Sequence, residues 1–269
     1  MKFSLFTALS MSIAASAASA STLLAARNDS AECVTPRPIP DLKGSDFKNF
    51  GVVLFRALDM LDVFGPLEPL QLLAVGTQQL NLHFIAETLD PISTRPASMN
   101  NFNSSFFPEI SVTNTFDDED LDLDVLIVPG GLGVRAPGLD AIEEYIRKVY
   151  PKVKLLITIC TGARLAARSG VMDGRLATTN KNSWDSTTAN GPDVKWVSPA
   201  RYIRDGDIWS SSGVTSGLDL IFNFVKTYWG EEEHDRIAGM VEHVTREWDD
   251  DPFSAHYGIP RTDSQPCLD

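Results

Sequence analysis

Short apolar runs alternate with stretches of helical spacing along most of this sequence, and this alternation limits its possible folds more than any other feature. Apolar runs of this length predict strands. They cover residues 50–55, 81–86, 125–128 and 155–159. Strands that alternate with helices form a parallel sheet with helices on both faces. The sequence therefore predicts an α/β domain with a mostly parallel sheet.

Apolar spacing and end signals predict five helices. They cover residues 64–75, 140–149, 161–168, 216–229 and 231–247. Asp140 is the expected N-cap of the second helix, and Gly170 follows the end of the third. Residues 90–107 predict a loop or edge hairpin, and residues 176–212 several short β segments with a hairpin turn at 204–207.

The first 20 residues predict a secretory signal peptide. Lys2 precedes an apolar run rich in alanine and serine, which ends at Ala18-Ser19-Ala20, a typical cleavage motif. The expected location is therefore secreted or extracellular. No later segment is long and apolar enough to span a membrane. The alternative is an N-terminus that is disordered or directs the chain to an organelle.

The remaining chain divides into three parts. Residues 21–47 are polar and proline-containing and predict an extended arm, residues 48–255 a single domain, and residues 256–269 a tail. The formal net charge is −13, which repels phosphate groups and so disfavours nucleic acid and anionic membranes as partners.

Three cysteines and two sequons agree with an oxidising compartment. Cys33 and Cys267, near the two ends, are candidates for one disulfide, which would leave Cys160 as a free thiol. The alternative is that the two outer cysteines stay unpaired. Asn28 and Asn103 begin N-x-S sequons and are glycosylation candidates.

Cys160 stands directly between the strand at 155–159 and the following helix. Ligands of parallel sheets bind at the carboxyl ends of strands. A cysteine at such a strand-to-helix turn is the thiol form of a nucleophile elbow. The helix N-terminus favours a thiolate, and the N–H groups of Thr161 and Gly162 can hold a developing negative charge. The alternative is a buried structural cysteine.

Several motifs in order resemble the ThiJ/PfpI superfamily of the class I glutamine-amidotransferase-like fold, and within it the isonitrile hydratase-like branch. They are LDVFGPLE at 61–68, VPGG at 128–131, CTGA at 160–163, GVMDGRLATT at 170–179, RDGDIWSSSGVTSGLD at 204–219 and DPF at 251–253. The resemblance covers residues 48–255. It implies a flavodoxin-like three-layer α/β/α sandwich with a cysteine nucleophile elbow, and a homodimer.

The resemblance also implies roles for single residues. Cys160 matches the nucleophile, Asp62 the acid beside it, and Thr161 a residue that assists the cysteine. Gly130 and Gly131 match the loop on the oxyanion side. A carboxyl beside a thiolate should have a raised pKa, so that Asp62 can donate a proton and later act as a base. The alternatives are a capping or loop aspartate for Asp62 and a plain tight turn for the glycines.

Two positions depart from related patterns. Protease-like members carry histidine directly after the cysteine, whereas this chain has Thr161, which disfavours protease activity. Asn180 stands where the hydratase branch commonly has histidine, at the substrate-binding end of the pocket. The chain's histidines are expected on the surface or in the core and lack metal-ligand spacing. They are His83, His234, His243 and His256. We expect no metal and, since no G-x-G-x-x-G follows a strand, no dinucleotide or other cofactor.

The leading hypothesis is an isonitrile hydratase-like enzyme, a carbon–nitrogen lyase in which Cys160 attacks a small electrophile and Asp62 moves the protons. The product would be an N-substituted formamide. One alternative is a glyoxalase or deglycase that acts on small dicarbonyls, and another is a cysteine redox sensor without catalysis. A ligand-sensing domain of a transcription regulator is disfavoured, since only about 20 residues follow the last predicted helix.

Overall fold

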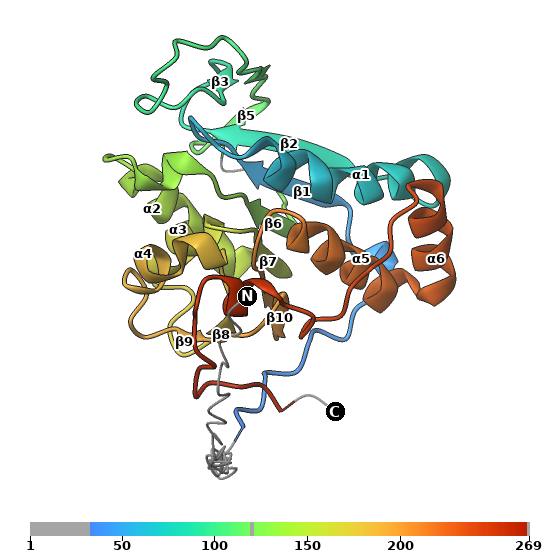
Figure 1. Ribbon diagram of the computed structural model, residues 1–269. Helices are drawn as coiled ribbons and strands as arrows, with labels where there is room; N and C mark the ends of the chain where they lie inside the picture. The colour runs from blue at the N-terminus through green and yellow to red at the C-terminus, as the bar shows by residue number, and fades with distance from the viewer. Residues whose placement is uncertain (1–32, 119–120, 268–269) are drawn as a thin grey trace, which may run out of the picture. The chain divides into compact units, whose positions relative to one another are not determined.

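A seven-stranded sheet runs through the residues that the computed structural model describes, 33–118 and 121–267 (Figure 1). Its strand order is β10-β11-β7-β6-β1-β2-β5, and every neighbouring pair is parallel except β10 and β11. The strands are β1 (Asn49–Val53), β2 (Asn81–Ala86), β5 (Asn114–Thr115), β6 (Val125–Val128), β7 (Leu155–Thr158), β10 (Tyr202–Asp205) and β11 (Ile208–Ser211). Two small sheets join β3 (Ile92–Ser93) to β4 (Glu109–Ile110), and β8 (Leu176–Ala177) to β9 (Lys195–Trp196).

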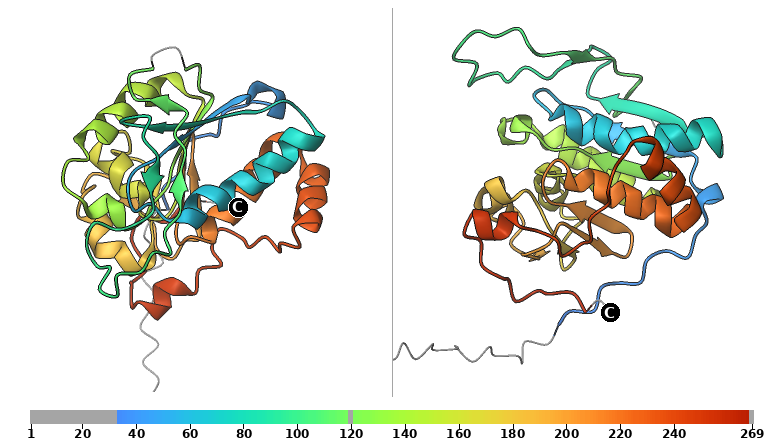
Figure 2. Two further views of the ribbon diagram at one scale, coloured as in Figure 1. Left: turned by 90° about the horizontal axis from the view of Figure 1, so that it is seen from above. Right: turned by 45° about the vertical axis from the view of Figure 1, so that its right-hand side comes forward.

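Helices cover both faces of the large sheet. The α-helices are α1 (Met60–Gly76), α2 (Asp140–Val149), α3 (Gly162–Arg168), α4 (Trp184–Thr188), α5 (Ser216–Trp229), α6 (Glu231–Met240) and α7 (Phe253–His256). Short 3-10 turns are η1 (Gly44–Asp46), η2 (Leu132–Arg135), η3 (Tyr150–Lys152) and η4 (Lys181–Ser183). In the left view of Figure 2, α2 and α3 lie on one side of the sheet and α1, α5 and α6 on the other. The predicted α/β/α sandwich is confirmed.

The central strands lie where apolar runs predicted them. All residues of β6 and β7 are buried, as expected for parallel strands covered on both faces. The strands β2 and β6 and the helix α5 have the predicted bounds. The predicted hairpin turn at 204–207 joins β10 to β11.

The starts of two helices differ from the predictions, one in its position and one in its capping residue. The helix α1 begins at Met60 rather than at Phe64, because the Asp59 side chain accepts the N–H of Leu61 and caps the earlier turn. As a result, Asp62 lies in the first turn of the helix. Asp140 is the first residue of α2 and not its N-cap, a position that Leu139 occupies.

The last long helix is shorter than predicted, and α4 was not predicted at all. The helix α6 ends at Met240 instead of continuing to residue 247, because Glu242 has a φ of +53°, which a right-handed helix does not allow. The chain turns there, so that residues 243–246 reach α5, where His243 Nε2 lies 2.9 Å from Asp219 Oδ1.

Both predicted end segments contact the domain within the described residues. Phe47 of the arm is fully buried against Phe224, and Gln265 Nε2 of the tail donates to Ser198 O at 2.9 Å. Cys33 and Cys267 form a disulfide with a Cα–Cα distance of 5.1 Å. The predicted signal peptide and Asn28 lie outside the described residues. No helix within 33–118 and 121–267 has the length and apolar character required to cross a membrane.

We expect the disulfide to stabilise the folded chain by about 2–4 kcal/mol, because it closes a loop between residues 234 positions apart. Urea unfolding of the Cys33→Ser/Cys267→Ser variant should show this difference in unfolding free energy against the oxidised wild type. Reduced wild type, tested beside it, should match the variant. An unchanged midpoint in both samples would contradict the prediction.

Candidate active site

Cys160 occupies the turn between β7 and α3, at the carboxyl edge of the sheet. Its φ of +56° is unusual for a residue other than glycine. Two backbone contacts hold this conformation: the Cys160 N–H donates to Ser211 O at 3.2 Å, and Thr179 Oγ1 donates to Cys160 O at 2.9 Å. Strain of this kind is characteristic of functional positions. The structure thus confirms the predicted cysteine elbow.

The Cys160 sulfur faces two donors. Asn180 Nδ2 lies 3.2 Å from the sulfur, and the backbone N–H of Thr161 also donates to it. The Asn180 amide cannot turn freely, because its Oδ1 accepts the N–H of Ser183 at 3.1 Å. The side chain therefore presents its N–H to the sulfur.

Asp62 is the acidic group beside the sulfur. It is fully buried in the first turn of α1, and its Oδ2 accepts the N–H of Gly130 at 2.9 Å. Its Oδ1 accepts no hydrogen bond from a nitrogen or oxygen donor. The Cys160 thiol, a weak donor, lies against the carboxyl. Burial, followed by the charge of Asp59, raises the pKa of Asp62 to about 7. Asp62 can therefore hold or release a proton near neutral pH.

Two glycines after β6 let the loop approach Cys160 closely. A Cβ at Gly130 would come within 2.9 Å of Asp62 Oδ2, and one at Gly131, where φ is +134°, within 2.6 Å of Ala57 O. Gly131 N–H donates to Thr161 Oγ1 at 2.9 Å. The glycine loop thus positions both Asp62 and Thr161.

The predicted oxyanion donors already have partners inside the protein. Gly130 N–H binds Asp62, Gly131 N–H binds Thr161, and Gly162 N–H donates to Ile159 O at 2.8 Å. A role for these three groups in holding an oxyanion stays a prediction and would require an exchange of hydrogen bonds. The donors that face the sulfur belong to Thr161 and Asn180.

The expected thiolate is wrong for the resting protein. Burial, followed by the charge of Asp62, raises the pKa of the Cys160 thiol well above its usual value, although Thr161 and Asn180 act in the opposite direction. Only 5% of Cys160 is exposed, so water stabilises its charge poorly. Cys160 is therefore a thiol at neutral pH, and Asp62 is the group that can accept its proton.

Lys181 and Asp251 form a buried ion pair behind Asn180 that the sequence analysis missed. Lys181 Nζ lies 3.3 Å from Asp251 Oδ2, and both side chains are almost completely buried. Nζ also donates to Thr178 Oγ1 and Ser212 Oγ, each at 2.9 Å. No local pattern indicates this contact, since the two residues are 70 positions apart. It fixes the turn that carries Asn180.

The histidines do not join this site in the described structure. His83 pairs with Asn114, His234 with Thr245, and His243 with Asp219, while the ring of His256 packs against Phe253 and Tyr257. Within residues 33–118 and 121–267, no group of three His, Cys, Asp or Glu side chains could hold a metal ion. Asn103 lies in the exposed loop between β3 and β4.

A model of the DJ-1/PfpI family matches residues 52–227, a span that includes Asp62, the glycine loop, Cys160 and Asn180. This chain belongs to the DJ-1/PfpI family. It is 26% identical over 197 residues to the curated isonitrile hydratase of Pseudomonas putida, with 72% of this chain and 78% of that protein covered.

Solved structures agree with the family fold. A THiJ/PfpI family protein from Pseudomonas syringae aligns with a TM-score of 0.62 and 22% identity, over 79% of this chain and 84% of that one. Drosophila melanogaster DJ-1beta aligns with a TM-score of 0.57 and 15% identity, over 74% and 99% of the two chains. At these identities the likeness concerns the fold.

For this DJ-1/PfpI protein we expect Asp62→Asn to increase stability while it removes the proton carrier. An ionised Asp62 is unfavourable when buried, and a rise in pKa from 3.8 to about 7 corresponds to at most about 4 kcal/mol. The folded state binds the Asp62 proton more tightly than the unfolded state does. The penalty for ionising buried Asp62 is therefore absent below the unfolded pKa of 3.8, grows as pH rises towards the folded pKa and is complete above about 7.

Thermal unfolding of wild type and Asp62→Asn at several pH values measures this effect. The melting temperature of the variant should exceed that of wild type most above pH 7 and least near pH 4. Glu68→Gln is the matched control: it removes a carboxylate from the exposed face of the same helix and keeps both Asp62 and Asp59. A variant less stable than wild type at high pH would contradict the predicted burial penalty.

Proposed function

We propose that this protein is a cysteine-dependent hydratase that adds water to a small electrophile such as an isonitrile and releases an N-substituted formamide. The observation that carries the proposal is the pairing of Cys160 with a buried carboxyl whose pKa is about 7. Such a carboxyl is half ionised at neutral pH and is matched to proton transfer in both directions. The isonitrile hydratase relative supports the choice of electrophile.

The first step is addition of the thiol to the terminal carbon of the isonitrile. Ionised Asp62 accepts the thiol proton while sulfur forms a bond to that carbon, and Asp62 then gives a proton to the same carbon. The product is a thioimidate, R–N=CH–S–Cys160. Asn180 donates to the sulfur throughout and stabilises the negative charge that develops on it.

The second step is addition of water to the same carbon. Asp62 accepts one proton as the water oxygen bonds to carbon and passes this proton to the imidate nitrogen, which gives R–NH–CH(OH)–S–Cys160 and leaves Asp62 ionised again. The carbon–sulfur bond of this tetrahedral species then breaks, the hydroxyl proton returns through Asp62 to sulfur, and R–NH–CHO leaves. The net reaction consumes one isonitrile and one water and regenerates the thiol.

Turnover of the purified protein on methyl isonitrile tests the proposal, with methylglyoxal assayed in parallel. Formamide production, measured by NMR, is the expected result. Lactate production without formamide would overturn the hydratase proposal in favour of a glyoxalase. Absence of both products would contradict catalysis on either class of electrophile.

The pH dependence of kcat/KM provides a further prediction. Because ionised Asp62 must accept the thiol proton, kcat/KM should rise with pH through an apparent pKa near 7 and then level off. Below that pKa it should fall about tenfold per pH unit. The apparent value belongs to the Cys160–Asp62 pair rather than to one residue.

Initial rates between about pH 5.5 and 8.5 measure this profile. The Cys160→Ala protein at each pH gives the background hydrolysis of the isonitrile, which is subtracted. A profile that stays flat across pH 7 would contradict the assignment of Asp62 as the proton acceptor.

Burial of Cys160 weighs against a role as a redox sensor. Sensor cysteines are accessible and have a low pKa, whereas this thiol is 5% exposed and its pKa is raised. Secretion, glycosylation at Asn28 or Asn103, and a homodimer stay predictions.

A further inference from the structure

A small hollow adjoins Asn180, whose side-chain amide also contacts the Cys160 sulfur. Its volume is about 180 Å³, and it opens between the turn that carries Asn180, the segment after β11 and the C-terminal helix α7. Its walls are formed by Asn180, Lys181, Asn182, Ser212, Gly213, Val214, Thr215, Phe253 and Tyr257. None of the proposed chemical steps uses it.

Two contacts connect the hollow to the nucleophile. Asn180 is part of its wall and also donates to the Cys160 sulfur at 3.2 Å. In the second contact, the Cys160 N–H donates to Ser211 O. Ser211 directly precedes residues 212–215, which form part of the wall of the hollow. Gly213 of this segment lies next to the same amide, since a Cβ on it would be 3.9 Å from Asn180 Nδ2.

The walls of the hollow favour a neutral, apolar group. Phe253 and Tyr257 are 48% and 47% exposed and, with Val214, offer uncovered apolar surface. Lys181 does not present its charge to the hollow, because its ammonium group contacts Asp251 and buried oxygen acceptors in the interior. An anionic ligand would therefore find no exposed cation among these residues.

The aromatic wall is held in place by the same ion pair that fixes Asn180. Besides Lys181, the Asp251 carboxylate accepts the N–H of Ala200 at 3.1 Å, the N–H of Phe253 at 3.0 Å and the hydroxyl of Ser254 at 2.7 Å. Both walls are thus anchored to one buried contact, and the hollow is a preformed feature of the fold.

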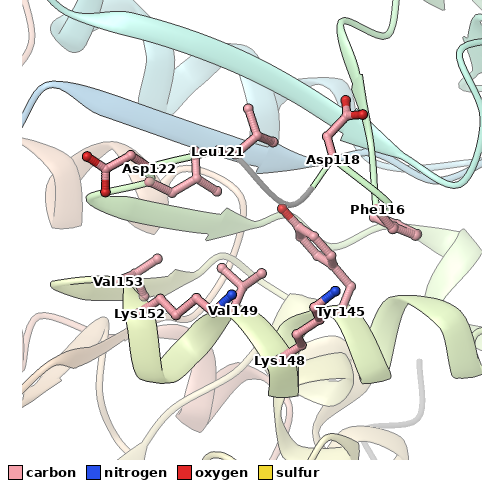
Figure 3. A pocket seen from close by; sticks show the side chains of 10 residues that line it. Phe116, Asp118, Leu121, Asp122, Tyr145, Lys148, Val149, Lys152 and Val153 are labelled. Atoms are coloured by element: carbon pink, nitrogen blue, oxygen red, sulfur yellow. The ribbon is translucent and has the colours of Figure 1, made fainter.

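The larger hollows lie elsewhere. The one in Figure 3 is lined by residues that precede β6 and β7, such as Leu123 and Val153, together with Tyr145 of α2. It therefore lies at the amino ends of the strands, whereas Cys160 follows the carboxyl end of β7. The groove between α1 and β2 has walls of Phe64, Leu67 and neighbouring residues and shares none of them with the cysteine site.

We infer that the hollow beside Asn180 binds the substituent of the electrophile that Cys160 attacks, and that Phe253 and Tyr257 determine which substituent fits. A cavity of about 150 Å³ can hold a benzene ring. The preferred substrates are therefore neutral electrophiles that carry one apolar, ring-sized group. This inference rests on the proposed hydratase function and adds its substrate class.

Paired substrates test the inference. We compare methyl isonitrile with benzyl isonitrile for wild type, Phe253→Ala, Tyr257→Ala and Phe253→Leu. Phe253→Ala should lower kcat/KM for the benzyl compound about 10- to 100-fold, mainly through KM, and leave the methyl compound within about twofold. Phe253→Leu should restore most of the loss. The control is Phe102→Ala, which removes a 93% exposed phenylalanine from a distant loop.

Equal losses on both substrates in Phe253→Ala and Tyr257→Ala, or no loss on either, would overturn the inference. Calorimetry of N-benzylformamide binding to the Cys160→Ala protein tests the binding site without any turnover. It therefore distinguishes a failure of the inferred binding site from a failure of the proposed hydratase function. If no isonitrile turns over but Phe253→Ala still weakens formamide binding, the function fails and the binding site stands. If the formamide does not bind, or binds equally well without Phe253, the inference fails.

Discussion

Replacement of Cys160 by alanine is expected to reduce formamide production at least about 10⁴-fold, to the level of the uncatalysed reaction. The sulfur is the atom that forms the covalent bond to substrate, and no other thiol is available, since Cys33 and Cys267 are joined in a disulfide. Mass spectrometry of wild type quenched during turnover should show a thioimidate adduct on Cys160.

The Cys160→Ser variant tests whether the loss of activity comes from the missing thiol chemistry or from the changed size of the side chain. Serine has nearly the same size, but its hydroxyl is far less acidic than a thiol, so a carboxyl with a pKa near 7 cannot activate it well. Both variants should keep the wild-type melting temperature within about 2 °C, which excludes unfolding as the cause of the loss. Activity above about one per cent of wild type in Cys160→Ala would contradict covalent catalysis by this residue.

The cysteine elbow could be predicted because its signals are local. An apolar run at 155–159 must be a buried strand, Gly162 and Ala163 allow a helix to start closely behind it, and the thiol stands between them. The proximity of Asp62 required the family resemblance, since 98 positions separate it from Cys160. The direction of the Asp62 pKa shift was predicted, but the predicted cause, a neighbouring thiolate, was wrong: burial and then Asp59 raise the pKa, whereas Cys160 lowers it.

Features that depend on distant contacts could not be predicted in the same way. The pKa of Cys160 depends on how deeply the fold buries the sulfur, and this opposes the helix N-terminus on which the expectation of a thiolate relied. The position of the turn that carries Asn180 depends on the pair of Lys181 with Asp251. Local periodicity carries no information on any of these contacts.

The shortened helix α6 shows how one such contact changes a boundary. Residues 231–247 have the composition of a helix, yet the chain leaves the helix after Met240 and contacts α5 instead. Asp219, fully buried on α5, accepts the side chain of Arg201 through Oδ2 and the N–H of Arg246 through Oδ1. This carboxylate therefore joins the segment before β10 to the segment that leads into α7.

Asp219→Asn is accordingly expected to destabilise the protein by about 3–5 kcal/mol, because it leaves the buried guanidinium of Arg201 without its counter-charge. Urea unfolding measures the loss. Asp235→Asn, which removes a 71% exposed carboxylate that pairs with His234 on α6, is the matched control and should cost less than about 1 kcal/mol. Because the penalty comes from the unpaired charge, Arg201→Met/Asp219→Leu should recover most of the stability lost in Asp219→Asn. A double variant no more stable than Asp219→Asn would show that packing around α5, rather than the buried charge, sets the cost.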